Sequence, residues 1–192
     1  MDEIVEAALR KWPNVPHCRG WLGLDVRGDW YLRDERAQAA GAFPAVRGSL
    51  IEHAKLREFI ARNYASDEAG CWYFQNGPQR VYVELEAAPW VWRLHPYDDS
   101  VVVRSHTGRE ARIDASCVDE HGRLFLAGPE GLGIVHSADV ELASRVVEAG
   151  TWRPEAVRFE TLPTRYRYVL SPAAKHPAAD DRADRATARQ PP

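Results

Sequence analysis

Residues 71–94 constrain the fold of this chain more than any other stretch, because they have the pattern of consecutive β-strands. Two runs that alternate apolar and polar residues flank Asn76-Gly77, and Asn-Gly between such runs is the strongest short-range signal for a β-hairpin. Pro78 follows directly, and proline has no backbone N–H to give a strand ladder. We therefore expect a loop wider than two residues, which sets Gln75 opposite Arg80.

This register divides the hairpin into two faces, because opposed residues in a hairpin share a face. One face is apolar and consists of Trp72, Phe74, Val81, Val83 and Leu85. The other face consists of Tyr73, Gln75, Arg80, Tyr82 and Glu84. A slip of one residue would turn every large apolar side chain toward water, so the register is expected to be well fixed. The run from Trp90 to Leu94, after the break at Pro89, predicts a third strand of the same meander.

The second face of the hairpin carries the candidate ligand-binding residues Tyr73, Arg80 and Tyr82. Two tyrosine rings opposite each other and next to a guanidinium suit the stacking of a planar or peptide ligand. The alternative is that another strand or a loop covers this face. Burial is the more common outcome for aromatic residues that alternate along strands.

The remaining chain predicts an α+β fold of antiparallel hairpins with two principal helices. Further hairpins are expected over 21–32, 101–113 and 118–126, with loops over 33–47 and 127–133 and a last strand over 165–170. A short helix is expected over 3–11, with Ile4, Ala7 and Ala8 facing inward. The first principal helix should begin at the capping box Ser49-Leu50-Ile51-Glu52 and end near Tyr64. The second should begin at Ser137 and end before Gly150, with a buried stripe of Val140, Ala143, Val146 and Val147.

The domain organisation expected from this pattern is one globular domain over 1–170 and a disordered tail over 171–192, which lacks large apolar residues. Leu24–Leu32 and Val118–Leu126 share the pattern apolar-Asp-x-x-Gly-x-apolar-aromatic-Leu. This match suggests two similar α+β halves, 20–95 and 100–170. A chance match of a common hairpin pattern explains it equally well.

Composition excludes several classes of partner. The formal net charge is −3, whereas nucleic-acid binding needs a concentrated basic surface. No apolar run approaches the roughly 18 residues of a membrane helix, and the acidic start has no signal-peptide pattern. Cys18, Cys71 and Cys117 are widely separated, which is typical of reduced thiols in a cytoplasmic protein.

No catalytic or cofactor motif is present in the sequence. The glycines of the run Gly128–Gly133 lack the lysine of a phosphate-binding loop and the spacing of a dinucleotide site. The histidines have no paired spacing typical of a metal site, so neither a metal nor a cofactor is expected. An enzyme would need a site assembled from dispersed residues such as His17, Asp25, His95 and His121.

Three segments carry a family resemblance: KWPNVP at 11–16, GWLGLD at 20–25 and FQNGPQRVYV at 74–83. They resemble an uncharacterised proteobacterial family, a domain of unknown function, over most of residues 10–150. The resemblance implies no substrate, cofactor or catalytic residue. The leading hypothesis is therefore a non-enzymatic cytoplasmic module that binds a protein or a small molecule, and the alternative is a small-molecule enzyme with a dispersed site.

Overall fold

The computed structural model describes residues 2–12, 15–98 and 100–175. Its described residues form an α+β fold, as predicted, and divide into two compact units. Both sheets are mixed, since parallel pairs join the predicted antiparallel hairpins. Unit 1 comprises the described residues within Met1–Asp25, Asp29–Glu86 and Val169–Pro192, and unit 2 comprises Val26–Gly28 and Ala87–Tyr168. The single domain expected over 1–170 stays a prediction, and each unit is described by itself.

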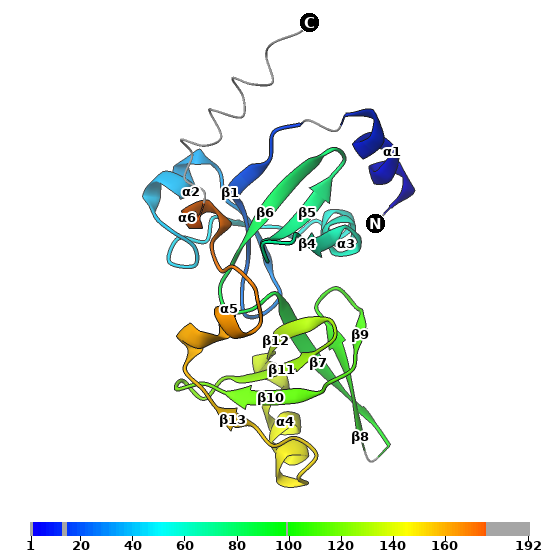
Figure 1. Ribbon diagram of the computed structural model, residues 1–192, viewed down its shortest axis with the longest axis vertical. Helices are drawn as coiled ribbons and strands as arrows, with labels where there is room; N and C mark the ends of the chain where they lie inside the picture. The colour runs from blue at the N-terminus through cyan, green and yellow to red at the C-terminus, as the bar shows by residue number, and fades with distance from the viewer. Residues whose placement is uncertain (1, 13–14, 99, 176–192) are drawn as a thin grey trace, which may run out of the picture. The chain divides into compact units, whose positions relative to one another are not determined.

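Unit 1 contains a six-stranded sheet in the order β3-β2-β1-β6-β5-β4 (Figure 1). The strands are β1 (Cys18–Leu24), β2 (Trp30–Leu32), β3 (Ser49–Leu50), β4 (Tyr64–Ser66), β5 (Trp72–Asn76) and β6 (Gln79–Leu85). Strands β1 to β3 and strands β4 to β6 are two antiparallel meanders, which the parallel pair β1 and β6 joins. The predicted register of the central hairpin is confirmed, since Gln75 pairs with Arg80 and Tyr73 with Tyr82.

Unit 2 contains a seven-stranded sheet in the order β13-β10-β11-β12-β7-β8-β9. The strands are β7 (Trp90–Tyr97), β8 (Ser100–Ser105), β9 (Glu110–Ala111), β10 (Ala115–Val118), β11 (Leu124–Gly128), β12 (Gly131–Val135) and β13 (Glu155–Ala156). The prediction that Trp90–Leu94 completes the first meander is wrong. Strand β7 instead pairs with β8 and, in parallel, with β12, and this long-range pairing leaves no local trace in the sequence.

The two sheets share one connectivity, which confirms the prediction of two similar halves. In each sheet the first strand of one meander (β1, β7) pairs in parallel with the last strand of the next meander (β6, β12). The corresponding strand sets are therefore β1–β6 and β7–β12. In this correspondence the β10–β11 loop at Asp119 matches the β4–β5 loop at Asp67, and not the loop at Asp25 that the sequence pattern suggested.

The same hairpin loop occurs four times among the described residues, with the pattern Asp/Ser-x-x-Gly-x. The first side chain accepts a hydrogen bond from the backbone N–H four residues later, while its own N–H donates to that residue's carbonyl. The four loops begin at Asp25, Asp67, Ser105 and Asp119. Their glycines have φ between 73° and 85°, a left-handed conformation that glycine adopts without a steric penalty.

The predicted N-terminal helix is confirmed as α1 (Glu3–Lys11), but its inward residue is Val5, and Ile4 is 77% exposed. The capping box at Ser49 is wrong, because Ser49 and Leu50 form β3, which pairs with β2. The helix α3 (Ala54–Arg62) begins later, where the His53 side chain accepts from the Leu56 N–H. Phe59 of α3 packs edge-to-face on Phe74 at 5.4 Å.

The second principal helix is confirmed as α4 (Val140–Glu148), which the short 3-10 helix η1 (Ser137–Asp139) precedes. The capping side chain is His136, which accepts from the Ala138 N–H, and not Ser137. Val140, expected in the buried stripe, is 52% exposed. Gly150 ends this turn with φ of 75°.

Three further segments differ from the predictions. Helix α2 (Glu35–Ala40) lies in the segment expected to be a loop, and Asp34 caps it. The strand expected over 165–170 is wrong, because α5 (Leu162–Arg165) follows the 3-10 helix η2 (Phe159–Thr161) and Arg167 has φ of 53°. The tail prediction is wrong for α6 (Pro172–Lys175), and the rest of the tail lies outside the described residues.

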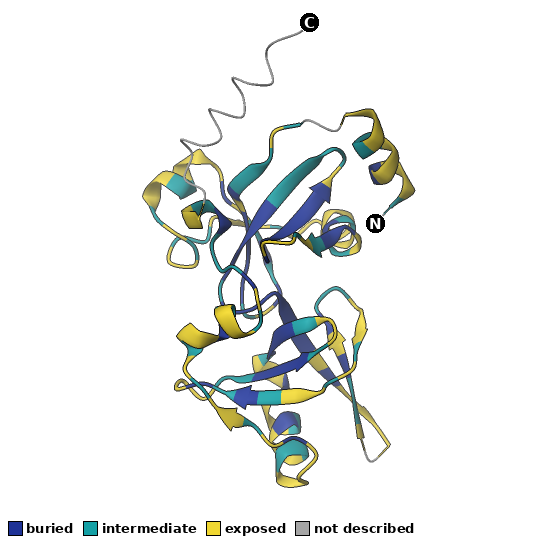
Figure 2. Cartoon of the chain, in the orientation of Figure 1, coloured by how far each residue is buried: buried dark blue, intermediate teal, exposed yellow. Residues whose placement is uncertain are grey.

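The glycines at 128–133 belong to the tight hairpin β11–β12 rather than to a loop. A Cβ on Gly133 would lie 2.3 Å from Nε1 of Trp92, so glycine is needed there to admit the indole. Trp90 and Trp92 stack at 5.9 Å, and their indole nitrogens donate to the carbonyls of Glu130 and Leu126. Figure 2 shows the buried residues on the central strands of each sheet.

Candidate functional site

The predicted ligand-binding residues lie together in unit 1 and are largely covered. Tyr73 and Tyr82 are 6% and 5% exposed, while Arg80 is half-buried. The guanidinium of Arg80 lies 4.6 Å from the Tyr73 ring centroid, and the hydroxyl of Tyr82 donates to Asp67 at 3.0 Å. The guanidinium of Arg19 covers the Tyr82 ring at 4.9 Å. The two rings therefore pack inside unit 1 and do not offer flat faces to solvent.

The returning chain at 169–175 contributes to this cover. Val169 packs on the cluster of Cys71, Tyr73 and Tyr82. Next to it, the buried carboxylate of Glu84 accepts from the Ser171 hydroxyl at 2.5 Å and from the Ala173 N–H at 3.1 Å. Burial raises the pKa of Glu84, and these two hydrogen bonds offset only part of that shift.

The residues proposed for a dispersed enzyme site are divided between the two units, and none of them lines the cavity described below. Asp25 is 2% exposed, and its carboxylate is engaged by the Asp29 N–H and by Arg47. His17 belongs to unit 1, whereas His95 and His121 belong to unit 2 and are exposed. Among the described residues, no group of three or more His, Cys, Asp or Glu side chains is placed to hold a metal ion.

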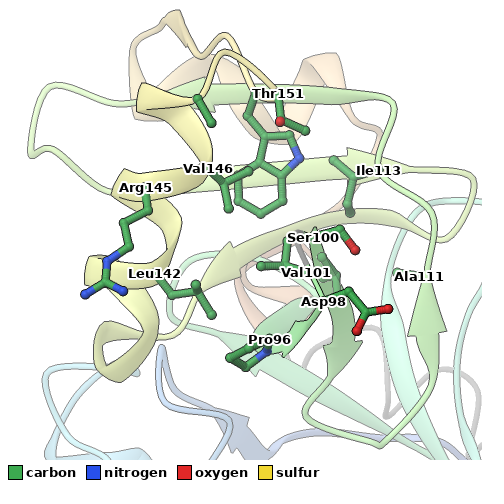
Figure 3. Close-up of a pocket in the computed structure, with 13 residues that line it drawn as sticks. Pro96, Asp98, Ser100, Val101, Ala111, Ile113, Leu142, Arg145, Val146 and Thr151 are labelled. Carbon is green, nitrogen blue, oxygen red and sulfur yellow. The ribbon is translucent and has the colours of Figure 1, made fainter.

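The described part of unit 2 contains an open cavity of about 540 Å³ beside α4 (Figure 3). Strands β7 to β9 and the segment that follows them form one wall, and α4 with its C-terminal extension forms the other. The lining residues are Pro96, Asp98, Ser100, Val101, Val103, Ala111, Ile113, Leu142, Arg145, Val146, Ala149, Thr151 and Trp152. Ligand sites in proteins commonly enclose about 300–1,000 Å³, so the volume suits a small molecule.

The periodicity of each element explains which side chains reach the cavity. Val101 and Val103 point to one face of β8, whereas Val102 points to the other, because strand side chains alternate. On α4 the lining residues Leu142, Val146 and Ala149 are spaced i, i+4 and i+7, which places them on one side of a helix. The cavity is therefore the seam between an apolar strand face and an apolar helix stripe.

The start of α4 is fixed to the sheet by Asp139. Strand β12 ends at Val135, and beyond it the carboxylate of Asp139 accepts from the Leu94 N–H at 3.1 Å and from Nε of Arg93 at 2.7 Å. Burial alone would raise the pKa of Asp139, but these hydrogen bonds and the positive charge of Arg93 outweigh it and lower the pKa. The helix is thus held at its first turn, while the cavity lies further along it.

The polar lining groups are few and lie around an apolar interior. The Ser100 hydroxyl donates to the Tyr97 carbonyl, and Arg145 donates to Glu141 on the same helix. None of the described lining residues is a histidine, cysteine or lysine, and the polar side chains among them are Asp98, Ser100, Arg145 and Thr151.

Sequence reasoning did not find this cavity. The available signals were the valines on one face of 101–103, the stripe Leu142, Val146 and Ala149, and Trp152 just after the helix-ending Gly150. Each signal predicts a buried face by itself. Only the position of α4 beside β8 in the folded unit shows that the two faces leave space between them.

These features define a class: an α+β protein of two similarly connected sheet units, with an open pocket of mixed polar and apolar lining in the second. The chain belongs to the family described as "Protein of unknown function (DUF2946)", whose model matches residues 1–175. This match confirms the expectation from the sequence that the chain belongs to a family of unknown function.

Two solved structures are similar to this chain. One is a DUF1285 family protein from Silicibacter pomeroyi DSS-3, with 11% sequence identity, a TM-score of 0.47, and coverage of 76% of this chain and 85% of that chain. The other is a DUF1285 family protein from Shewanella baltica OS155, with 15% identity, a TM-score of 0.43, and coverage of 69% and 93%. No curated protein matches the sequence.

No helix in the part of the chain that the structure describes combines the length and the apolar character needed to cross a bilayer.

Proposed function

We propose that this protein is a non-enzymatic binding module whose ligand is a small apolar molecule held in the unit 2 cavity. The observation that carries the proposal is the open space of about 540 Å³ between α4 and strands β7 to β9. Small-molecule sites are typically concave clefts with a few polar groups in the lining. A space of this size, lined by Val101, Val146, Leu142 and Trp152, supports a role in accommodating a ligand.

The location of the cavity also supports binding. Its mouth is open to solvent, and Asp139 ties the start of α4, which forms one wall, to β7 of the other wall. Small ligands gain most of their affinity from buried apolar contact, and a few polar groups then set their orientation. Asp98, Ser100, Arg145 and Thr151 are the polar groups available for that purpose.

The test uses a neutral apolar dye, Nile red, and a matched pair of variants on β8. Val101→Trp places an indole in the cavity, whereas Val102→Trp places the same side chain on the opposite face of the strand. We expect a saturable rise in dye emission with the wild type and with Val102→Trp, and its loss with Val101→Trp. Equal emission from both variants, or none from the wild type, contradicts the proposal.

The proposed setting is the cytoplasm of a proteobacterial cell. Cys71 and Cys117 are buried thiols that form no disulfide. Burial raises the pKa of both thiols, which keeps them protonated and unreactive. Free buried thiols are typical of proteins in reducing compartments. Fractionation of cells that express the tagged full chain tests this setting, and recovery from the periplasm contradicts it.

A further inference from the structure

We propose that the ligand of the unit 2 cavity is an apolar carboxylic acid, with its hydrocarbon part inside and its carboxylate at Arg145. This inference rests on the proposed function, since it names the ligand class for the same site. It follows from the charges around the cavity, the state of Arg145 and the nature of the walls.

Among the lining residues that the structure describes, the charged ones are Arg145 and Asp98. Figure 3 shows them on opposite sides of the cavity, Arg145 on α4 and Asp98 at the turn after β7. A ligand carboxylate is attracted to the helix side and repelled from the turn, so the two charges together set one orientation. A ligand ammonium group at α4 meets a like charge instead.

Arg145 is available to a ligand because its present ion pair is weakly held. It donates to Glu141 one helical turn earlier, and the two side chains are 70% and 82% exposed. Exposed pairs with this spacing contribute little to stability. Figure 3 shows the guanidinium turned to the outer side of α4, with its stem beside Leu142 and Val146. Rotation about exposed side-chain bonds takes picoseconds to nanoseconds, so the guanidinium exchanges one carboxylate for another without losing a paired charge.

The walls favour a flexible aliphatic chain. The interior is formed by branched side chains, chiefly Val101, Val103, Leu142 and Val146, and the Trp152 indole is 8% exposed. Each buried methylene is expected to tighten binding about fourfold. Affinity should therefore rise with chain length until the cavity is filled.

The experiment is isothermal titration calorimetry of the full chain with octanoate, octan-1-ol and octylammonium, which share a chain and differ in the head group. We expect octanoate to bind about two- to fivefold more tightly than octanol, the range for an ion pair to an exposed arginine, and octylammonium to bind weakest. Arg145→Gln should remove the preference for octanoate. Arg153→Gln, an exposed arginine in the same unit that does not line the cavity, should keep it. Glu141→Gln should tighten octanoate binding about twofold, because Arg145 loses its competing partner.

Failure of this inference is distinguishable from failure of the proposed function. If octanoate and octanol bind equally, or if Arg145→Gln keeps the preference, the carboxylate assignment is overturned while the pocket stands. If none of the three C8 ligands binds but Val101→Trp still abolishes Nile red emission, the carboxylate assignment is again overturned and the pocket stands. If the dye also fails to bind the wild type, both proposals fall.

Discussion

Replacing Gly133 with alanine should destabilise unit 2 strongly, although glycine-to-alanine changes in strands are often harmless. The added Cβ would lie 2.3 Å from Nε1 and 2.5 Å from Cε2 of Trp92, and 2.7 Å from Cβ of Trp90. Trp92 is 1% exposed and donates its indole N–H to the Leu126 carbonyl at 2.8 Å. The ring has no free volume to enter, so it must move and weaken this hydrogen bond.

The magnitude follows from two costs and one gain. Overpacking a dense core costs about 1–3 kcal/mol, and leaving a buried polar group unpaired costs about 1–3 kcal/mol. Alanine also has less conformational freedom than glycine in the unfolded chain, which offsets about 0.4–1 kcal/mol of these costs. The free energy of unfolding should therefore fall by about 2 to 5 kcal/mol. Gly150→Ala is the control: no atom lies within 4 Å of its Cβ position, and its φ of 75° adds only the backbone penalty, about 1 kcal/mol.

Urea denaturation of the full chain, followed by far-ultraviolet circular dichroism, measures both variants. The Trp92 indole N–H resonance in a ¹H–¹⁵N spectrum gives a local readout, and it should shift in Gly133→Ala but not in Gly150→Ala. A Gly133→Ala protein as stable as Gly150→Ala, with the indole resonance unmoved, refutes the reasoning.

Three further predictions concern buried polar groups. Burial alone raises the pKa of Asp119, but hydrogen bonds from the Arg123 N–H and guanidinium outweigh it and lower the pKa. The stability of the wild type should therefore fall relative to that of Asp119→Asn as the pH drops below about 4. Urea denaturation at a series of pH values measures this difference. Burial raises the pKa of Glu84. Its contribution to stability is therefore greatest below about pH 4.3 and is lost as the pH rises through the pKa of Glu84 in the folded state. In the same assay, the stability of Glu84→Gln relative to wild type should rise from pH 4 to 7. Arg33 is 3% exposed and donates to three backbone carbonyls, which a lysine cannot reach together. Arg33→Lys should therefore lower the free energy of unfolding by about 2–4 kcal/mol. A thermal midpoint within 1 °C of wild type, which corresponds to roughly a quarter kcal/mol, contradicts this.

The local parts of the fold were predictable because neighbouring residues encode them. Alternation around Asn76-Gly77 fixes the pairing of Gln75 with Arg80, since any slip exposes the apolar face. The hairpin loops at Asp25, Ser105 and Asp119 are predictable from the Asp/Ser-x-x-Gly spacing, whereas the loop at Asp67 is not among the predicted hairpins.

The errors arose where tertiary contacts override a local pattern. Ser49 has the residues of a helix cap, but pairing of Leu50 with Tyr31 extends the sheet there. The alternating Arg165–Leu170 segment has strand character, yet the Tyr168 hydroxyl is tied to the Ala87 carbonyl. The glycines at 131 and 133 lie against the indoles of two tryptophans about 40 residues earlier in the chain. No local sequence rule reveals this contact.

The candidate site was less predictable than the fold for the same reason. Tyr73, Arg80 and Tyr82 do meet, as the hairpin register required, but Arg19 and the returning segment at 169–175 cover them. That cover depends on parallel pairing of β1 with β6 and on the chain's return to unit 1. The cavity in unit 2 depends on how α4 packs on β8, which is again a non-local property.

The most direct test of the binding role is a methyl-selective NMR titration of the full chain with octanoate. The account predicts saturable shift changes for the methyl groups of Val101, Leu142 and Val146, with Val102 and Val83 unmoved. Shift changes confined to unit 1, or none at millimolar octanoate, would contradict it.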